Sequence, residues 1–217
     1  MIRMISFEGG DGSGKTTQIN LLAGHLTNRG ISCLLTREPG GTTLGRLIRK
    51  VVVEGAEEEI AYQAELFLYL ADRAEHVRKV IQPAIKSNSL VLCDRFTDST
   101  LAYQSYGRGA DIALVRRMNR LASGGVEPDL TFFLDCPVEL GLARAAKRVA
   151  GKKLGSSRPD RFENEDLDFH ERVRRGFLEL AQEEPGRIVV IDAAAPIREV
   201  HEEIKRIVDQ KLGGSGQ

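Results

Sequence analysis

The sequence has few of the residues from which disulfide frameworks and structural zinc sites are built. Its 217 residues include three cysteines (Cys33, Cys93 and Cys136), no C-x-x-C pair and four scattered histidines. An odd number of widely spaced cysteines within apolar runs favours buried free thiols in a reducing compartment. A chain of this length can bury a core without disulfides or a structural metal.

The sequence also lacks an excess of charge and a long apolar run. Lys+Arg and Asp+Glu are both 31, so the formal net charge is zero, which argues against a polybasic nucleic-acid-binding protein. No apolar run approaches the ~20 residues of a membrane-spanning helix. The segment before Glu8 is too short and polar for a signal peptide. We expect a soluble cytoplasmic protein without a nucleic-acid or membrane partner.

Short apolar runs alternate with longer segments of helical period. The expected strands are residues 2–7, 33–36, 90–93, 130–134 and 188–191. The expected helices are residues 16–29, 57–86 with a break at Pro83, 114–122, 138–149, 167–182 and 197–212. Continuous apolar runs are typical of parallel strands covered on both faces. The alternation predicts a single α/β domain.

A glycine-rich segment after the first expected strand fits the pattern G-x-x-x-x-G-K-[ST]. Its residues are Gly9, Gly10, Asp11, Gly12, Ser13, Gly14, Lys15 and Thr16, with Thr17 following. Such glycines let backbone N–H groups point at phosphate oxygens, and the helix N-terminus adds positive potential. We expect an ATP site in which Lys15 reaches the β- and γ-phosphates and the Thr16 hydroxyl binds Mg²⁺. The alternative is a glycine-rich turn that binds nothing.

Several classes of phosphate-binding-loop protein fit poorly. A GTPase needs an N-K-x-D segment, which the chain lacks, and an adenylate-kinase-type loop carries glycine where Thr16 stands. A mechanical ATPase would be longer. Phosphoryl transfer to a small acceptor suits this size best.

Charged residues follow the second and third expected strands, at the edge of a parallel sheet where ligands bind. Arg37, Glu38 and Pro39 follow the second strand, and Asp94 and Arg95 follow the third. Arg37 can hold an acceptor phosphate in a bidentate manner. Asp94 can hold Mg²⁺ through water, while Arg95 can offset charge on the transferring group. The alternatives are an ordinary turn and a strand-end ion pair.

Together these motifs resemble bacterial thymidylate kinases. The matching segments are FEGGDGSGKTTQ (7–18), REPGGT (37–42), DR (94–95) and STLAYQ (99–104). The resemblance implies transfer of a phosphoryl group from ATP to dTMP with Mg²⁺. It implies a P-loop NTPase fold with a five-stranded parallel sheet flanked by helices on both faces. It also implies a homodimer, for which the apolar faces of residues 61–71 and 114–121 are candidates.

The resemblance assigns roles on the acceptor side. Arg37 and Arg95 match the acceptor-phosphate ligands, Phe67 the aromatic that stacks on thymine, and Arg73 the donor to a base carbonyl. The other matched positions are Glu38 and Pro39 in the acceptor turn, Asp11 at the sugar 3′-hydroxyl, Ser99, Thr100 and Gln104 near the base edge, and Tyr103, which would block a 2′-hydroxyl. From periodicity alone, Phe67 would be core, Arg73 a solvated charge and Tyr103 a surface tyrosine.

The charges are unevenly distributed near the end of the chain. Residues 144–161 carry seven cations and one acid (7 − 1 = +6), and residues 162–184 carry three arginines and eight acids (3 − 8 = −5). A basic, glycine-containing loop predicts a lid over the triphosphate, although a nucleic-acid patch or a solvated lysine loop are alternatives. We expect one domain over residues 1–212, with a lid insertion at about 150–163 and a flexible tail at 213–217.

The lid is expected to supply catalytic arginines. One branch of the resembled family has an arginine at the loop position of Gly12, whereas the bacterial branch takes arginines from the lid, and this chain matches the second. Arg148, Arg158 and Arg161 are the candidates, and Arg161 is preferred because Asp160-Arg161-Phe162-Glu163 resembles the family's lid end. On the adenine side, the matching positions are Arg144, Ala195 and Pro196.

Two other functions remain open at this stage. The first is a kinase of another nucleoside monophosphate, such as UMP or dCMP. The second is a P-loop regulatory or nucleic-acid-associated protein that uses ATP as a switch. The cis or trans state of the Glu38–Pro39 bond is also open.

Overall fold

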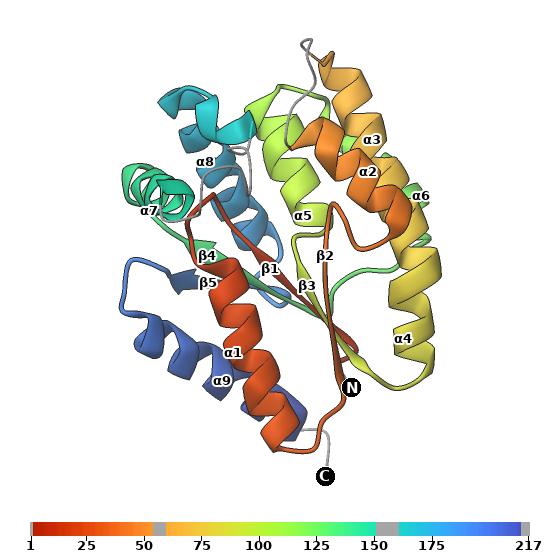
Figure 1. Cartoon of the computed structure of the whole chain (residues 1–217), viewed down its shortest axis with the longest axis vertical. Helices are drawn as coiled ribbons and strands as arrows, with labels where there is room; N and C mark the ends of the chain where they lie inside the picture. Colours follow the sequence, from red (N-terminus) through yellow and green to blue (C-terminus); the bar gives the residue numbers. More distant parts are fainter. Residues whose placement is uncertain (1, 54–59, 151–160, 214–217) are drawn as a thin grey trace.

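Five parallel strands form the centre of the molecule. The computed structural model describes residues 2–53, 60–150 and 161–213. The strands are β1 (Met4–Glu8), β2 (Cys33–Arg37), β3 (Leu90–Asp94), β4 (Leu130–Asp135) and β5 (Ile188–Asp192), in the order β2-β3-β1-β4-β5 (Figure 1). Every pairing between neighbours is parallel. The predicted α/β fold with a five-stranded parallel sheet is confirmed.

The central strands are apolar because helices cover both faces of the sheet. All five residues of β1 are buried, and in the register Ile5 lies between Leu92 of β3 and Leu130 of β4. The edge strands β2 and β5 are only partly buried. Burial on both faces explains why the central strands are continuous hydrophobic runs.

Helices pack against each face of the sheet. They are α1 (Lys15–Asn28), α2 (Thr43–Val52), α3 (Tyr62–His76), α4 (Gln82–Lys86), α5 (Thr97–Thr100), α6 (Ile112–Ser123), α7 (Val138–Ala150), α8 (Leu167–Glu183) and α9 (Ile197–Gly213). Helices α1 and α9 pack on one face, where Leu22 and Ile204 join Phe132 in one core cluster. On the other face, Leu66 of α3 and Phe177 of α8 pack in a second cluster with Phe133 (Figure 1).

The helical region before β3 differs from the prediction. We expected a break at Pro83, but the chain continues from α3 through a π-helical segment (Val77–Ile81) into α4. The prediction was wrong: Pro83 is the second residue of α4, directly after the π-helical segment, where the hydrogen-bond pattern changes and a residue without an N–H is tolerated. The wider π turn before it accommodates the ring.

Two further helical segments were not predicted from periodicity. Helix α2 buries Gly45, Ile48 and Val52 and leaves Leu44, Leu47 and Val51 exposed. It begins where the Thr42 hydroxyl accepts the Gly45 N–H at 2.9 Å. The second segment is α5, which continues into a π-helical segment (Leu101–Gly107) that is almost wholly buried. Across the described ranges, no helix is both long and apolar enough to cross a membrane.

Candidate functional site

A cavity of about 750 Å³ lies at the carboxyl ends of β1, β2 and β3. Most predicted site residues line it: Asp11, Gly12, Ser13, Gly14, Lys15, Thr16, Thr17, Arg37, Glu38, Pro39, Arg73, Asp94, Arg95, Ser99, Thr100, Tyr103, Gln104, Arg144, Arg148 and Ala195. Sequence reasoning missed other lining residues, among them Gln18, Arg49, Tyr69, Phe96, Phe162 and Glu163. Among the residues that the structure describes, the predicted ones that do not line it are Gly9, Gly10, Phe67, Arg161 and Pro196.

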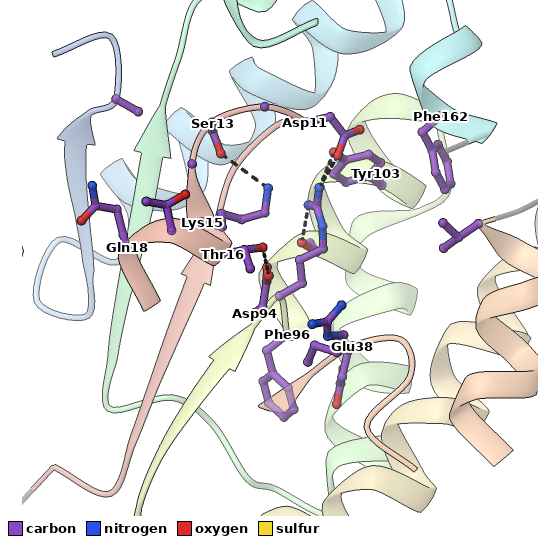
Figure 2. Close-up of a pocket in the computed structure, with 18 of the residues that line it drawn as sticks. Asp11, Ser13, Lys15, Thr16, Gln18, Glu38, Asp94, Phe96, Tyr103 and Phe162 are labelled. Atoms are coloured by element: carbon purple, nitrogen blue, oxygen red, sulfur yellow. Dashed lines mark hydrogen bonds and ion pairs between the residues drawn. The ribbon is translucent and has the colours of Figure 1, made fainter. Parts of the chain in front are cut away.

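The glycine-rich loop encloses the amino group of Lys15 (Figure 2). Lys15 Nζ donates to the carbonyl oxygens of Gly9 at 3.0 Å and Gly10 at 2.8 Å, so these two glycines act through their backbone. Burial, followed by the charge of Arg95, lowers the pKa of Lys15 to about 8. The loop therefore holds a buried cation at the start of α1, where an anionic ligand would be stabilised.

Gly12 allows the loop to approach helix α7. Its φ is +70°, in the left-handed region, and a Cβ at this position would lie 1.9 Å from the carbonyl oxygen of Gly141. A Cβ on Gly141 would in turn lie 2.5 Å from the carbonyl oxygen of Asp11. No side chain fits at position 12 without moving the backbone of the loop or of α7.

Two oxygen ligands meet beside the loop. The Thr16 hydroxyl donates to Asp94 Oδ2 at 2.8 Å (Figure 2). Within the described ranges, no group of three or more His, Cys, Asp or Glu side chains could hold a metal alone. A hydroxyl with one carboxylate suits Mg²⁺, which usually takes one or two protein oxygens and completes its shell with phosphate and water.

Arg95 connects the loop to the acceptor side. Its guanidinium donates to Asp11 Oδ1 at 2.9 Å, to the Gly9 carbonyl at 2.9 Å and to the Tyr103 hydroxyl at 3.1 Å. The φ of Arg95 is +69°, which is uncommon for a residue with a side chain. Burial opposes ionisation of Asp11, but the charges of Arg95 and Lys15 hold its pKa below the usual value.

Glu8 supports the backbone around Arg95. Its carboxylate accepts the Phe96 N–H at 2.7 Å and the Ser99 hydroxyl at 2.5 Å. Burial and the negative charge of Asp98 raise the pKa of Glu8 to about 7. Both hydrogen bonds hold the segment that follows Arg95, so Glu8 of the neighbouring strand β1 supports the unusual backbone conformation of Arg95.

Strand β2 ends with the exposed Arg37, and the turn that follows begins with the buried Glu38. Arg37 is exposed at the cavity, and Arg49 of α2 reaches the same wall, where it donates to the Pro39 carbonyl at 3.2 Å. The Glu38–Pro39 peptide bond is cis. Glu38 Oε2 pairs with Arg73 Nη2 at 2.8 Å, and its Oε1 lies 2.9 Å from His76 Nδ1. The turn is thus tied to α3 by buried polar groups.

A second carboxyl lies next to this turn. Asp72 Oδ1 accepts the Gly40 N–H at 3.1 Å, whereas Oδ2 has no hydrogen-bond partner in the part of the chain that the structure describes. Burial and the charge of Glu38 raise the pKa of Asp72 to about 6. The turn therefore carries a carboxyl that resists ionisation.

On α3, the aromatic residue that lines the cavity is Tyr69 and not the predicted Phe67. Phe67 is 57% exposed and does not line the cavity, whereas Tyr69 does. The reason is helical geometry: residues four apart share a face of a helix, as Tyr69 and Arg73 do, while residues six apart do not. This spacing was available in the sequence and could have identified Tyr69.

Arg73 is held in the cavity wall by several acceptors. It is 2% exposed, so it is not a solvated charge. It donates to Glu38, and its Nη1 donates to Thr100 Oγ1 at 2.9 Å and to Asn119 Oδ1. Its guanidinium lies 5.0 Å from the centre of the Phe96 ring. Thr100 and Gln104 are both buried and line the same part of the cavity.

Tyr103 is buried beneath the cavity, and the surface interpretation is wrong. It is 6% exposed, and its ring packs edge-on against Phe162, Phe169 and Phe177. The Arg95 guanidinium lies 4.9 Å from the centre of this ring. Tyr103 thus joins Arg95 to the aromatic core on this face.

The basic arm is described only at its two ends. Arg148, near the end of α7, lines the cavity and pairs with Glu163 at 3.0 Å. Arg161, which we preferred, instead pairs with the buried carboxylate of Glu65 on α3. This ion pair directs Arg161 to the acceptor side. Arg158 lies outside the described residues.

On the opposite wall, Arg144 of α7 contacts the turn after β5. Its Nη1 donates to the Ala193 carbonyl at 2.8 Å, and Ala193 and Ala195 line the cavity. Pro196 lies in the same turn but does not line the cavity. Gln18 donates to the Ile197 carbonyl at 3.0 Å, which joins this wall to α1.

The fold and the cavity define a class of protein, the P-loop nucleotide kinases. Comparisons with known proteins identify the family. A thymidylate kinase family model matches residues 7–204. The chain is 49% identical over 215 residues to the thymidylate kinase of Desulfovibrio desulfuricans, with 98% of each chain covered. It is 50% identical over 208 residues to that of Synechococcus sp. (strain JA-2-3B'a(2-13)), with 96% of this chain and 95% of the relative covered.

A solved structure leads to the same family. The crystal structure of thymidylate kinase from Ehrlichia chaffeensis matches with a TM-score of 0.75 at 35% identity, covering 94% of this chain and 97% of that one. The chain belongs to the thymidylate kinase family.

Proposed function

We propose that the protein transfers the γ-phosphoryl group of ATP to the 5′-phosphate of dTMP, giving ADP and dTDP. The observation that carries the proposal is one cavity with two ends: the phosphate-binding loop around Lys15 and a slot beside Tyr69 and Arg73. Membership of the thymidylate kinase family supports thymidylate as the acceptor. It does not favour another monophosphate or a regulatory switch.

On the donor side, the backbone of the loop and Lys15 would hold the β- and γ-phosphates. Lys15 would exchange its contacts with two loop carbonyls for phosphate oxygens. Thr16 and Asp94 would hold Mg²⁺, which supplies charge neutralisation on the phosphates. The remaining ATP contacts would come from Ser13, Gly14, Thr17, Arg144 and Ala195.

On the acceptor side, cationic side chains would hold the phosphate of dTMP. Arg37, Arg95 and the newly found Arg49 line this part of the cavity, and guanidinium groups bind phosphate in a bidentate manner. Tyr69 would contact the base, in place of the Phe67 that we predicted. Arg73 would donate to a base carbonyl, with Ser99, Thr100 and Gln104 at the base edge. Asp11 would meet the 3′-hydroxyl, and Tyr103 would exclude a 2′-hydroxyl.

The transfer would be direct and in line. An oxygen of the dTMP phosphate attacks the γ-phosphorus while the bond to the β–γ bridging oxygen breaks, and ADP leaves with that electron pair. No general base is required, because a phosphate monoester is already ionised near neutral pH. Arg95 and Arg148 would offset the charge on the transferring group.

We infer a single domain over residues 1–212, with a tail at 213–217 and a lid at about 150–163. Two observations support the lid. Residues 144–161 carry a net charge of +6, and Arg148 and Phe162, which lie near the two ends of the lid segment, both line the cavity. A closed lid would exclude water and so limit ATP hydrolysis. Residues 151–160 lie outside the described residues, so the roles of Arg158 and its neighbours rest on sequence.

One assay tests the function. ADP release is measured with ATP and Mg²⁺ against dTMP, dUMP, UMP, CMP, AMP and GMP in turn. We expect kcat/KM for dTMP to exceed that for each other acceptor at least ~10-fold. ATP binding without acceptor-dependent turnover would contradict the proposal, and preference for another acceptor would reassign the substrate.

We also propose a homodimer. The support is a set of exposed apolar side chains on α2, α3 and α6: Leu47 and Phe67 are each 57% exposed and Leu121 is 84% exposed. Helix α3 packs against both α2 and α6, so the three helices form one side of the molecule (Figure 1). Light scattering after size-exclusion chromatography is expected to give twice the 23.9 kDa chain mass.

The cysteines support a cytoplasmic setting. Cys33, Cys93 and Cys136 are all free thiols, which suits a reducing compartment where ATP is also abundant. Fractionation of the producing cells, followed by the dTMP assay, tests this location.

A further inference from the structure

Glu65 is a buried carboxylate behind the acceptor slot, and the proposed function gives it no role. It lies on α3, is 1% exposed and does not line the cavity. Its Oε1 accepts from Gln104 Nε2 at 2.8 Å. Its Oε2 pairs with Arg161 and lies 3.6 Å from Arg108 Nη2. The charges of Arg161 and Arg108 therefore face Oε2, and the side-chain amide of Gln104 donates a hydrogen bond to Oε1.

This arrangement determines the orientation of the Gln104 side chain. An amide has a donating NH₂ end and an accepting carbonyl end, whereas an ionised carboxylate only accepts. The NH₂ end of Gln104 must therefore point to Glu65. The reverse orientation would bury two acceptors against each other, because Gln104 is only 3% exposed. The carbonyl end is left for the cavity that Gln104 lines.

A carbonyl at this point distinguishes between pyrimidines. Thymine and uracil carry an N3–H donor between two carbonyl oxygens, so a protein carbonyl can accept from it. Cytosine carries an unprotonated N3, which is an acceptor, and would meet the Gln104 carbonyl with repulsion. A buried site with an unmatched acceptor rejects such an analogue strongly.

We propose that Glu65 is a positioning residue whose charge fixes the Gln104 carbonyl toward the acceptor base, so that the slot selects monophosphates whose base carries an N3–H. The inference rests on the proposed function, since it assumes that a pyrimidine monophosphate occupies the slot. Glu65 does not touch the substrate and acts through Gln104.

The variant Glu65→Gln tests the inference. It keeps the size of the side chain but can donate as well as accept, so the Gln104 amide can take either orientation. We expect the ratio of kcat/KM for dTMP to that for dCMP to fall about 10-fold, mainly through the two acceptor KM values. The dTMP to dUMP ratio, which reports on the C5 methyl group, and the KM for ATP are expected to change less than about twofold.

A matched control is Glu165→Gln. Glu165 pairs with Arg108 at 2.6 Å, and Arg108 also lies 3.6 Å from Glu65. Glu165 therefore shares a cation with Glu65, but it does not contact Gln104. Its dTMP to dCMP ratio is expected to equal that of the wild type. In a Gln104→Met background, Glu65→Gln should no longer alter the ratio, because the two residues act on one interaction.

The outcomes separate this inference from the proposed function. If the wild type uses dTMP and Glu65→Gln keeps the wild-type dTMP to dCMP ratio, the inference is overturned and the function stands. If the wild type has no dTMP turnover, the proposed function fails and the inference with it. If Glu65 had only a structural role, Glu65→Gln would lower the unfolding temperature and change kcat/KM by the same factor for every acceptor. If Glu65→Gln does not fold, Gln104→Met alone must lower the ratio about 10-fold, and an unchanged ratio overturns the inference.

Discussion

The donor and acceptor halves of the cavity are built in different ways. The donor half comes mainly from one continuous segment, residues 9–17, whose backbone curves between β1 and α1. The acceptor half gathers side chains from separate parts of the chain, including Arg37 at the end of β2, Tyr69 on α3 and Arg95 after β3. A backbone cradle depends on local sequence, whereas a side-chain slot depends on which faces of the helices meet.

The two halves are also stabilised differently. On the donor side, backbones pack closely, as Gly12 does against Gly141. On the acceptor side, buried charges hold one another, as Glu38 and Arg73 do at 2.8 Å. The donor half should therefore be most sensitive to added volume, and the acceptor half to changes in hydrogen bonding and charge.

The largest effect is expected from Gly12→Ala. The added Cβ would meet the Gly141 carbonyl at 1.9 Å, so both the loop and α7 must move. Because displacements of about 1 Å cost ~10²-fold in rate and two walls are affected, we expect kcat/KM for ATP to fall about 10³-fold. Steady-state kinetics at saturating dTMP measures this. The control is Gly24→Ala on α1, where a Cβ meets no atom within 4 Å; an equal loss there would mean that the close contact is not the cause.

The next largest effect is expected from Arg148→Ala, and it should differ in kind from the effect of Arg161→Ala. Arg148→Ala should lower kcat about 10²-fold, because it removes one charge partner of the transferring group. Arg161→Ala should leave kcat nearly unchanged and raise the KM for dTMP, because Arg161 contacts Glu65 on the acceptor side. Initial rates with each substrate varied separate the two. An equal loss of kcat in both variants would show that Arg161 also reaches the phosphates.

Next in size is the contrast between two aromatic residues on α3. Tyr69→Ala should raise the KM for dTMP about 10-fold and leave the KM for ATP unchanged, because an aromatic contact with a base is worth ~1–3 kcal/mol. Phe67→Ala should change neither KM, since Phe67 is 57% exposed. The comparison is best made by isothermal titration of each variant with dTMP. A larger loss of affinity in the Phe67 variant would restore the original assignment.

The smallest effect is one of stability and depends on pH. The Asp72 carboxyl has a pKa of about 6 in the folded protein against an ordinary value of 3.8, so between these values the folded state binds the extra proton. Stability from this group is therefore present at low pH and is lost as pH rises through about 6. Asp72→Asn keeps an acceptor for Gly40 but cannot ionise. At pH 7.5 it should be more stable than the wild type by on the order of 1–2 kcal/mol.

Urea unfolding at pH 4.5 and pH 7.5 checks this last prediction. The difference between Asp72→Asn and the wild type should shrink at the lower pH, where the wild-type carboxyl is also neutral. A constant difference at both values would show that the amide acts through packing and that ionisation plays no part.

The sequence predicts the donor half better than the acceptor half for a physical reason. The loop pattern, the strand before it and the helix after it lie within about thirty residues, and the strands themselves are continuous apolar runs. Tyr69 was missed although its four-residue spacing from Arg73, which places both on one face of a helix, can be read from the sequence. Arg161 was assigned to the donor side because the sequence does not show that Glu65 is buried within its reach.

Two other differences lie in helical segments. Helix α2 was missed although its apolar residues recur at helical spacing, with Ile48 and Val52 buried four residues apart. The continuation through Pro83 depends on the π-helical segment before it. Arg49 reaches the cavity from α2, so missing this helix also meant missing a cationic residue of the cavity wall.

The contact between Gly12 and Gly141 also limits how a protein of this family can change by mutation. One branch of the resembled family carries an arginine in the loop, and this chain instead has the cationic arm. In this protein, a single codon change at position 12 would meet the backbone of α7 at 1.9 Å, an obstacle that no rotamer avoids. An arginine at position 12 of this protein would therefore require a compensating shift of α7.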